Sequence, residues 1–339
     1  MDLIYIRFDK IKNTNASGIL HNYTVDFDIT NNTQNITNDF ELKTNLPSPE
    51  DILFSENEIS TWIFIDDTEF GGIITGYTID IENNVITYTG RTWRGMLSNY
   101  IIEPPIGQDY LTVSGLLSDI IENLPISPMM EVEAAAYSIG SYDFERFIPT
   151  FDGIVSLLAA ANSDLRLFVN FEQTPNTPDG VVTLTIDERR DLRNQIDFSQ
   201  DYNSNINLKI TRNGQTPKKL ICLGQGEGAL QEVVELYADD DWNVSTTPIA
   251  NAYPVAIYSA TSSQDLESDG RTYFEELIAN HEQIDVVVEN MDLILGDIIG
   301  AKDYISGQIA SAEVTGIILN IEDYGNYQTY SFNYQTREI

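Results

Sequence analysis

The sequence predicts a β-rich α+β fold, with strands dominating both ends of the chain and helices grouped between them. Apolar and polar residues alternate along the first hundred residues and again after about residue 206, which is the two-residue period of half-buried strands. Between these parts, apolar residues recur at the three- and four-residue spacing of helices. The chain has 339 residues, of which 42% are hydrophobic, so it can form two or three domains with packed cores.

The first part, 1–100, is predicted to form a small barrel or sandwich. Its last two runs are joined by Glu82-Asn83-Asn84, and asparagine tolerates the positive φ that tight hairpin turns require. Short strands at this spacing are typical of small barrels and sandwiches. The alternating runs lie at 2–9, 23–29, 62–65, 73–81 and 85–89.

The middle part, 101–205, is predicted to combine helices with strands. Pro104-Pro105 and Pro125 end the first two helices, because proline interrupts the hydrogen bonding of a helix. The mixed-charge run 187–191 is predicted to be a solvated turn. The elements expected in and just before this part are helices at 93–100, 112–124 and 151–162 and strands at 165–171 and 181–186.

The last part, 206–339, is predicted to be a second β domain with a helix inserted near 263–281. The helix is indicated by apolar residues at helical spacing, including Phe274 and Ile278. In the final run, Tyr330, Phe332 and Tyr334 line one face. The predicted strands are 206–210, 220–223, 233–236, 284–288, 317–321 and 327–334.

The charge of the chain is far from balanced. It has 53 acidic and 18 basic residues, for a net charge of −35. Two explanations stay open: general solubility or adaptation to salt, and a surface that repels an anion. A chain this acidic is a poor nucleic-acid binder, because affinity for phosphate needs a Lys/Arg surface. Repulsion has a use of its own, since like charge keeps DNA off a wall within a Debye length of about 8–10 Å.

No residue pattern for catalysis or metal binding is present. The two histidines, His21 and His281, have no second His or Cys at ligand spacing, and there is no Gly-x-Ser-x-Gly sequence. Cys222, the single cysteine, lies in an apolar run and is predicted to be a buried small hydrophobic residue. We therefore predict no catalytic, cofactor-binding or metal-binding residues, and no cofactor.

Three further motifs are each better explained by a turn than by a site. Gly224-Gln225-Gly226-Glu227-Gly228 follows a predicted strand but lacks the third glycine of a dinucleotide loop and a nearby basic residue. We predict a glycine-rich bend between strands there. Asp239-Asp240-Asp241 lacks the pattern of a calcium loop and is predicted to be a solvated turn. Gly296-Asp297 is predicted to be a tight turn joining two core strands.

The sequence also bears on location. Met1-Asp2-Leu3-Ile4 is not a basic region followed by an apolar stretch, and no run of 18 apolar residues occurs. With one cysteine no disulfide can form within the chain. These features lead us to expect assembly in the cytoplasm and no membrane span.

Three segments resemble siphophage tail-hub proteins, also called baseplate hub proteins. The first is Gly90-Arg91-Thr92-Trp93-Arg94-Gly95-Met96-Leu97, followed by Ile101-Ile102-Glu103-Pro104-Pro105; the second is Leu220 to Glu227; the third is Leu295-Gly296-Asp297. Their order and spacing match the family over about 90–300. The chain departs from the family after the second segment, where Gly228-Ala229-Leu230-Gln231 replaces the usual basic residues.

The resemblance implies a fold like that of the central hub of contractile tails, with two small β-barrels similar to a tail-tube subunit and an α/β middle part. The expected domains are then an N-terminal tube-like barrel at 1–100, an α+β domain at 101–205 and a second barrel at 206–339. Three copies would form a ring, and six barrels would match a six-fold tube. The expected function is a non-enzymatic structural hub at the tail tip of a long-tailed bacteriophage, with an acidic channel for DNA.

The partners implied by the resemblance are two further copies of the chain, the tail tube protein, a distal tail ring protein, a tip or fibre protein and the tape-measure protein. Genomic DNA would be present only in transit. Two alternatives remain: a carbohydrate- or receptor-binding module, suggested by the many Tyr and Trp residues, and a glycosidase with paired carboxylates. The hub hypothesis also predicts ring contacts on an outer barrel strand, for example at Tyr327 or Gln328.

Overall fold

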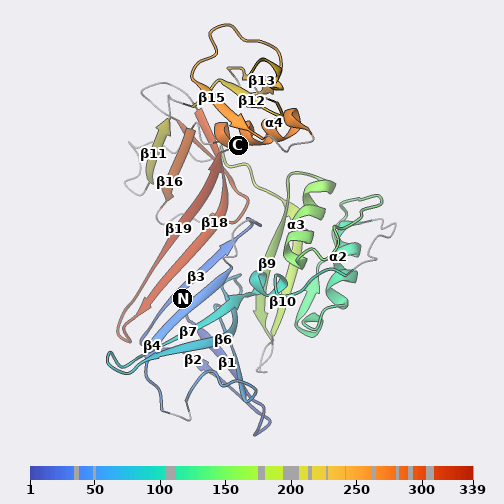
Figure 1. The fold of residues 1–339 in the computed structure, drawn as a ribbon. Coiled ribbons are helices and arrows are strands. Elements are labelled where there is room, and N and C mark those ends of the chain that lie inside the picture. The colour runs from blue at the N-terminus through green and yellow to red at the C-terminus, as the bar shows by residue number, and fades with distance from the viewer. Residues whose placement is uncertain are drawn as a thin grey trace. The chain divides into compact units, whose positions relative to one another are not determined.

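The chain forms two compact units in the computed structural model (Figure 1). The larger unit comprises Met1–Asn207 and Val286–Arg337, and the smaller comprises Leu208–Asp285. The structure describes residues 1–33, 38–48, 51–103, 112–174, 180–193, 206–212, 216–226, 228–240, 242–260, 265–279, 282–288, 293–302 and 309–338.

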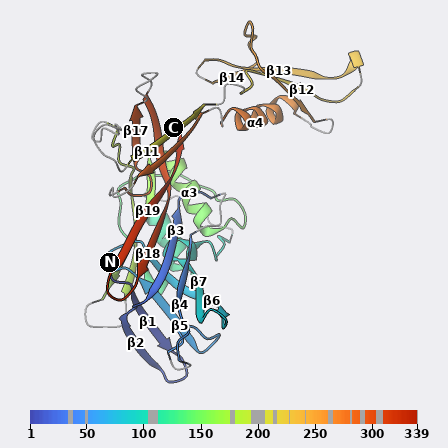
Figure 2. The ribbon, with the colours of Figure 1, turned by 90° about the vertical axis from the view of Figure 1, so that its left-hand side faces the viewer.

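A ten-stranded sheet dominates the larger unit (Figure 1, Figure 2). The strand order is β17-β18-β3-β4-β7-β6-β5-β1-β2, and β19 pairs with β18 beside this path. Strands from the two ends of the chain are therefore neighbours, since β18 pairs antiparallel with β3. The strands are β1 (Ile4–Asp9), β2 (Thr14–Ile19), β3 (Tyr23–Thr30), β4 (Asp39–Asn45), β5 (Ile59–Phe64), β6 (Gly71–Asp80), β7 (Val85–Thr92), β17 (Ile298–Lys302), β18 (Ile309–Asp323) and β19 (Gln328–Glu338).

Alternation along each strand gives this sheet one core-facing side. In β3, Val25 and Phe27 are fully buried and Ile29 is almost so, because successive side chains of a strand point to opposite faces. Val25 and Phe27 pack with buried residues of β4, β5, β7 and β18 into one hydrophobic cluster. Thr24, Asp26 and Asp28 alternate with them and lie on the opposite face, where the site described below is found.

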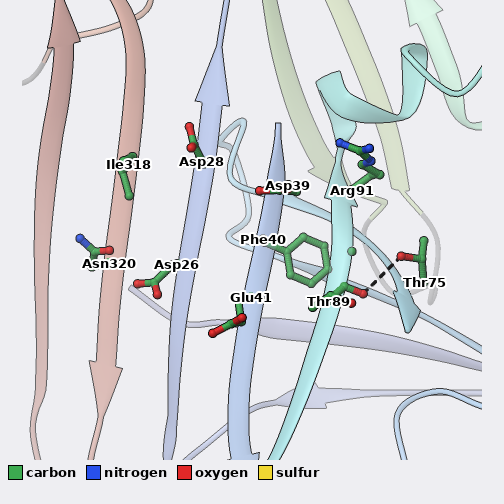
Figure 3. Close-up of a pocket in the computed structure, with 11 residues that line it drawn as sticks. Asp26, Asp28, Asp39, Phe40, Glu41, Thr75, Thr89, Arg91, Ile318 and Asn320 are labelled. Atoms are coloured by element: carbon green, nitrogen blue, oxygen red, sulfur yellow. Dashed lines mark hydrogen bonds between the residues drawn. The ribbon is translucent and has the colours of Figure 1, made fainter. Parts of the chain in front are cut away.

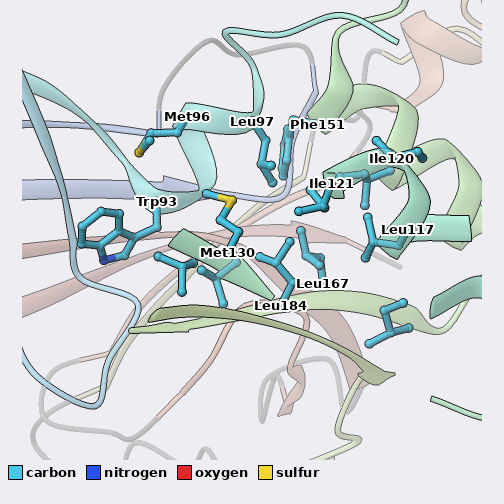
Figure 4. Packing of buried hydrophobic residues seen from close by; sticks show 14 of the residues in the cluster. Trp93, Met96, Leu97, Leu117, Ile120, Ile121, Met130, Phe151, Leu167 and Leu184 are labelled. Carbon is cyan, nitrogen blue, oxygen red and sulfur yellow. The ribbon is translucent and has the colours of Figure 1, made fainter. Parts of the chain in front are cut away.

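A second layer of helices and a three-stranded sheet covers another part of the larger unit. Its sheet has the order β8-β10-β9, and its residues share one hydrophobic cluster with the helices (Figure 4). Trp93 stacks on Phe171 with ring centroids 4.8 Å apart, which joins β9 to the start of α1. The elements are α1 (Trp93–Leu97), α2 (Val113–Glu122), a 3₁₀ turn (Ser127–Met129), β8 (Met130–Val132), α3 (Thr150–Ala161), β9 (Leu165–Gln173) and β10 (Gly180–Glu188).

Local sequence explains where these helices begin. The side chains of Thr92 and Thr112 each accept a hydrogen bond, 3.2 Å long, from the backbone N–H of the residue three positions later. Such caps satisfy N–H groups that have no partner inside the helix. The three helices predicted between residues 93 and 162 are thus confirmed, although the first ends at Leu97.

The smaller unit is a four-stranded sheet with one helix. The sheet order is β14-β13-β12-β15, and α4 contacts β12 and β13. Cys222 is fully buried beside this helix, as predicted, and burial raises the pKa of its thiol. Its elements are β12 (Lys219–Leu223), a 3₁₀ turn (Gly228–Leu230), β13 (Val233–Ala238), β14 (Val244–Ser245), β15 (Val255–Ser259) and α4 (Leu266–Ala279). The strands β11 (Ile206–Arg212) and β16 (Glu282–Val288) pair with each other, and the residues of each are divided between the two units.

The β-rich α+β class is confirmed. The two small barrels stay a prediction, because the described strands form open sheets and no closed barrel. The division at residues 100 and 205 also stays a prediction, and the structure groups one segment differently: β17, β18 and β19 join the sheet of the first hundred residues. No helix in the described part of the chain is long and apolar enough to cross a bilayer.

Candidate functional site

The outward side of the ten-stranded sheet carries a cluster of carboxylates. Because Val25 and Phe27 point into the core, their neighbours Asp26 and Asp28 project from the other side of β3. The same alternation places Asp39 and Glu41 on that side of β4. We call Asp26, Asp28, Asp39 and Glu41 the acidic face (Figure 3).

Strand register places like charges directly opposite one another on the acidic face. Asp26 faces Glu41, and Asp28 faces Asp39. Like charges in such cross-strand positions are destabilising by a fraction of a kcal/mol per pair. Relief is partial: Arg91 on β7 faces Asp39, and the Lys43 ammonium lies 2.6 Å from a Glu41 oxygen. The arrangement is therefore one that stability alone does not favour.

The surroundings of these carboxylates hold the pKa of three of them above the usual range. Burial raises the pKa of Asp28, and the facing Asp39 raises it further. Burial also raises the pKa of Asp39, against the opposing effect of Arg91. For Asp26, burial is again the main cause, with Lys43 opposing it. The charges of Asp26, Asp28 and Asp39 thus cost free energy in the folded state.

The acidic face borders a hollow of about 600 Å³. Phe40 is the only aromatic residue among the described residues that line it, and it is 3% exposed. The hollow therefore presents carboxylates without an exposed ring on which a sugar would stack. The lining residues are Asp26, Asp28, Asp39, Phe40, Glu41, Thr75, Thr89, Gly90, Arg91, Ile318 and Asn320.

Chemically, the acidic face can repel anions or attract cations. Within the described ranges, no group of three or more His, Cys, Asp or Glu side chains is placed to hold a metal ion. A polyanion that approaches this surface meets negative charge that is only partly compensated by Lys43 and Arg91, within a Debye length of about 8–10 Å. The arrangement is accordingly suited to a wall along which a polyanion passes without binding.

A second charged cluster, which we call the arginine cluster, consists of Arg166, Arg189 and Arg337 around Glu313. Glu313 is 2% exposed, although it belongs to β18 like the residues beside the acidic face. Arg166 Nε donates to its Oε1 over 2.7 Å. Arg189 and Arg337 each donate to its Oε2 over 3.2 Å. The cluster links β9 and the end of β10 to β18 and β19.

The prediction of a solvated turn at 187–191 is wrong in two respects, because Asp187 and Glu188 belong to β10 and the Arg189 side chain is only 18% exposed. Arg189 belongs to the arginine cluster, and Arg190 makes a bidentate pair with fully buried Asp297, over 2.7 and 2.6 Å. Asp297 also accepts from the Ile294 backbone N–H over 2.8 Å. Glu313 and Asp297 lie more than a hundred residues away from these arginines along the chain, so the local charge pattern did not reveal them.

Arg94 is a further buried arginine that the sequence did not identify. It is 0% exposed and makes a bidentate pair with Glu69, over 2.5 and 3.0 Å. It also donates to Asn31 Oδ1 and to the Leu167 carbonyl. Through this ion pair and these hydrogen bonds, Arg94 connects the start of α1 with the loop after β5, with the end of β3 and with β9.

No protein-family model matches the chain, and no curated protein sequence matches it either. Solved structures, in contrast, do match the chain in fold. A tail protein from Neisseria meningitidis MC58 aligns over 99% of this chain and 97% of its own, with a TM-score of 0.52 and 15% identity. The 43 kDa tail protein of prophage MuSo2 from Shewanella oneidensis aligns over 99% and 98%, with a TM-score of 0.53 and 11% identity. Prophage tail protein gp18 from Listeria monocytogenes EGD-e aligns over 100% and 94%, with a TM-score of 0.51 and 12% identity.

The chain shares the fold of phage tail proteins. At these identities the likeness concerns the fold alone, and it extends over nearly the whole length of each protein. The resemblance proposed from three short segments is thereby confirmed at the level of the tail-protein fold.

Within this tail-protein fold, the first two segments form a strand followed by a helix and a strand followed by a bend. Gly90 lies in β7, where an added Cβ would stand 2.2 Å from the Ile73 carbonyl oxygen, so the close strand approach requires glycine. Gly226 has a φ of +102° in the bend between the antiparallel strands β12 and β13. A dinucleotide-binding loop would instead lead into a helix that crosses over to a parallel strand. The prediction of a glycine-rich bend between strands is therefore confirmed.

The third segment and the aspartate run are turns. Gly296 has a φ of +89°, and the Asp297 N–H donates to the Ile294 carbonyl ahead of β17. Asp239 accepts from the Asn243 backbone over 2.8 Å, and the Lys218 ammonium lies 3.8 Å from Asp240. Asp241 and His281 lie outside the described residues.

Proposed function

We propose that the chain is a structural hub at the tail tip of a long-tailed bacteriophage, and not an enzyme. In this proposal three copies form a ring in the virion that joins the six-fold tail tube to the baseplate or tip. The observation that carries it is the fold match to tail proteins over 97% and 98% of two of them. A match of that extent is expected when the whole chain, rather than one module, has the tail role.

The acidic face lines the bore of this ring. Its unfavourable cross-strand pairs, Asp26 with Glu41 and Asp28 with Asp39, are explained if the surface serves DNA passage rather than stability. Like charge along the wall keeps DNA from adhering as it slides. DNA is then present only in transit, without stable binding.

The expected partners follow from the position in the tail. The ring contacts the tail tube protein and a distal ring protein on one side and a tip or fibre protein on the other, and the tape-measure protein lies within. Two tube-like barrels per chain, completed on assembly, would supply six barrels for the six-fold tube. Assembly takes place in the host cytoplasm.

The first test is the mass of the purified protein in solution, by light scattering at moderate salt, together with negative-stain images. We expect a mass of three chains and rings with a central opening. A monomer at all concentrations, with no ring when the tail tube protein is added, contradicts the hub proposal.

The role of the acidic face has its own test. We expect tailed particles carrying the quadruple substitution Asp26→Lys, Asp28→Lys, Asp39→Lys and Glu41→Lys to assemble but to release their DNA more slowly. The matched control reverses four carboxylates on α4, namely Glu267, Asp269, Glu275 and Glu276, which changes the net charge equally. Equal release rates in the two variants contradict a bore-lining role.

A carbohydrate-binding or glycosidase function is the second candidate, favoured by the facing carboxylates of the acidic face. Retaining glycosidases place two carboxyl groups about 5–5.5 Å apart. The hollow lacks an exposed aromatic ring, which counts against sugar binding. Release of reducing sugar from host cell-wall glycan, abolished by Asp28→Asn, would establish this candidate in place of the hub.

A further inference from the structure

Charge is absent from three long runs of this otherwise acidic chain. Charged residues make up 21% of the sequence. The three longest runs without Asp, Glu, Lys or Arg are 13–25, 242–264 and 324–336. Their positions in the sequence are unrelated, so a shared reason has to come from the fold.

The fold provides a shared reason: each run contains at least one edge strand, which has a paired neighbour on one side only. Among the described strands, β2 pairs only with β1, and β19 pairs only with β18. In the smaller unit, 242–264 contains β14 and β15, the two edges of its sheet. Other edge strands of the larger unit do carry charge: β8 has Glu131, β9 has Arg166 and Glu172, and β17 has Lys302.

An edge without charge is open to pairing. A free strand edge offers a row of unpaired N–H and C=O groups, and natural proteins protect such edges with charged side chains, proline or bulges. Neither β2 nor the stretch of β19 up to Thr336 contains proline or a charged residue. Two copies that each carry −35 repel one another at long range, so close approach is least costly where charge is missing.

Side chains around β19 also lack cover. Tyr327 is 61% exposed and Tyr330 is 52% exposed. Tyr330 contacts the ring of Phe332, which packs on Phe70 at a centroid distance of 5.9 Å. On β2, Ile19 is 47% exposed. Aromatic residues that are half-buried at a free edge gain the most from a partner strand, because burial of apolar area is favourable.

We propose that β19 of one copy pairs edge to edge with β2 of the next copy, so that the ten-stranded sheet continues across the subunit boundary. The two edges differ, so the contact is head to tail, and such contacts generate a ring when the rotation closes. The inference rests on the proposed ring and names its contact surface. The smaller unit does not offer an equivalent pair, since β14 has two residues and is too short to guide a strand.

Cysteine pairing tests the contact directly. Ser17→Cys on β2 and Ser331→Cys on β19 are purified separately as full chains, mixed and oxidised, and neighbours one position away on each strand are tried in turn. We expect a disulfide-linked dimer only when a β2 variant meets a β19 variant, since paired strands bring Cα atoms within reach of a disulfide. The control is Thr78→Cys, which is exposed on β6 inside the same sheet. Native Cys222 is buried and does not interfere.

Charge placement gives an independent readout in the same proteins. We expect Ser17→Glu or Ser331→Lys alone to lower the solution mass towards one chain, and the double variant to restore it, because opposite charges then face each other. Thr78→Lys should leave the mass unchanged. Thermal unfolding followed by circular dichroism checks that each variant is folded.

The outcomes separate this inference from the proposed function. A ring-forming wild type whose β2 and β19 cysteines cross-link no faster than Thr78→Cys overturns the edge contact but leaves the hub intact. A wild type that stays monomeric and cross-links at the control rate overturns both. Cross-linking of a β19 cysteine to the tail tube protein, and not to β2, overturns the assignment of the edge to a second copy.

Discussion

The arginine cluster and the acidic face both border β18, but they differ in how their charges are compensated. At the arginine cluster, Glu313 is buried and three guanidinium groups surround its carboxylate. Towards the other end of the strand, Ile318 and Asn320 face Asp28 and Asp26, which in turn face further carboxylates on β4. The arginine cluster surrounds its buried carboxylate with guanidinium groups, whereas the acidic face places like charges opposite one another.

The ion pairs of the arginine cluster stabilise the fold, whereas the like charges of the acidic face destabilise it. Removing one member of a buried pair leaves an uncompensated charge and is strongly destabilising. Removing a charge from a like pair relieves repulsion. Substitutions in the two regions should therefore change stability with opposite signs, and the following predictions run from the largest expected effect to the smallest.

The largest loss is expected for Arg190→Met. It removes the bidentate partner of the fully buried Asp297 carboxylate, which still accepts from the Ile294 N–H. We expect the free energy of unfolding to fall by about 3 kcal/mol, the lower end of the range for breaking a buried pair. Urea unfolding at pH 7 measures it. A loss below about 1 kcal/mol, the value of an ordinary surface pair, would show that the pair is not structural.

A smaller loss is expected for Glu313→Gln, because Arg166, Arg189 and Arg337 are themselves 15%, 18% and 69% exposed and regain water when the carboxylate is gone. We expect about 2 kcal/mol by urea unfolding. The matched control is Glu41→Gln on the acidic face. Equal losses in the two variants would remove the contrast between the regions.

A gain in stability is expected for Asp28→Asn. The folded-state pKa of Asp28 lies above its usual value, so its charged form costs stability at neutral pH and that cost disappears as the pH falls through this pKa. We expect the variant to be more stable by about 0.5 kcal/mol at pH 7 and equal to wild type near pH 3. Urea unfolding across this range tests the slope, and a variant less stable than wild type at pH 7 contradicts the repulsion.

The smallest effect, with the opposite sign, is expected for Asp191→Asn. Hydrogen bonds from Arg193 lower the pKa of Asp191 to about 2, so its charged form stabilises the fold above its ordinary pKa, and this contribution is lost as the pH falls towards about 2. Both side chains are over 40% exposed, so we expect a loss of only a few tenths of a kcal/mol at pH 7. A gain at pH 7 would contradict the pairing.

Sequence patterns predicted the parts of the fold that depend on near neighbours. The helices α2, α3 and α4 were found because apolar residues repeat at helical spacing. The strand β2 was missed, since Thr14–Ile19 has no apolar alternation and every residue is exposed or half-exposed. Its place in the sheet is set by pairing with β1.

Features that depend on distant partners could not be predicted in the same way. Alternation in β3 does show Asp26 and Asp28 on one side, but the facing carboxylates of β4 follow from strand register. The partners of Arg189 and Arg190 in β18 and before β17 were equally hidden. Like the pairing of β18 with β3, they are set by the tertiary fold.

Because β3 pairs with β18, this part of the sheet cannot form until the end of the chain has been synthesised. Thr30 pairs with Gly316, and Tyr23 with Asp323. Ribosomes add about 5–20 residues per second, so β3 emerges roughly 15–60 s before its partner strand. During that interval β3 has only β4 as a neighbour, with one long edge open to other nascent chains. Asp26 and Asp28 on its outward face put negative charge beside that open edge, and charge near a free edge disfavours pairing between unfinished chains.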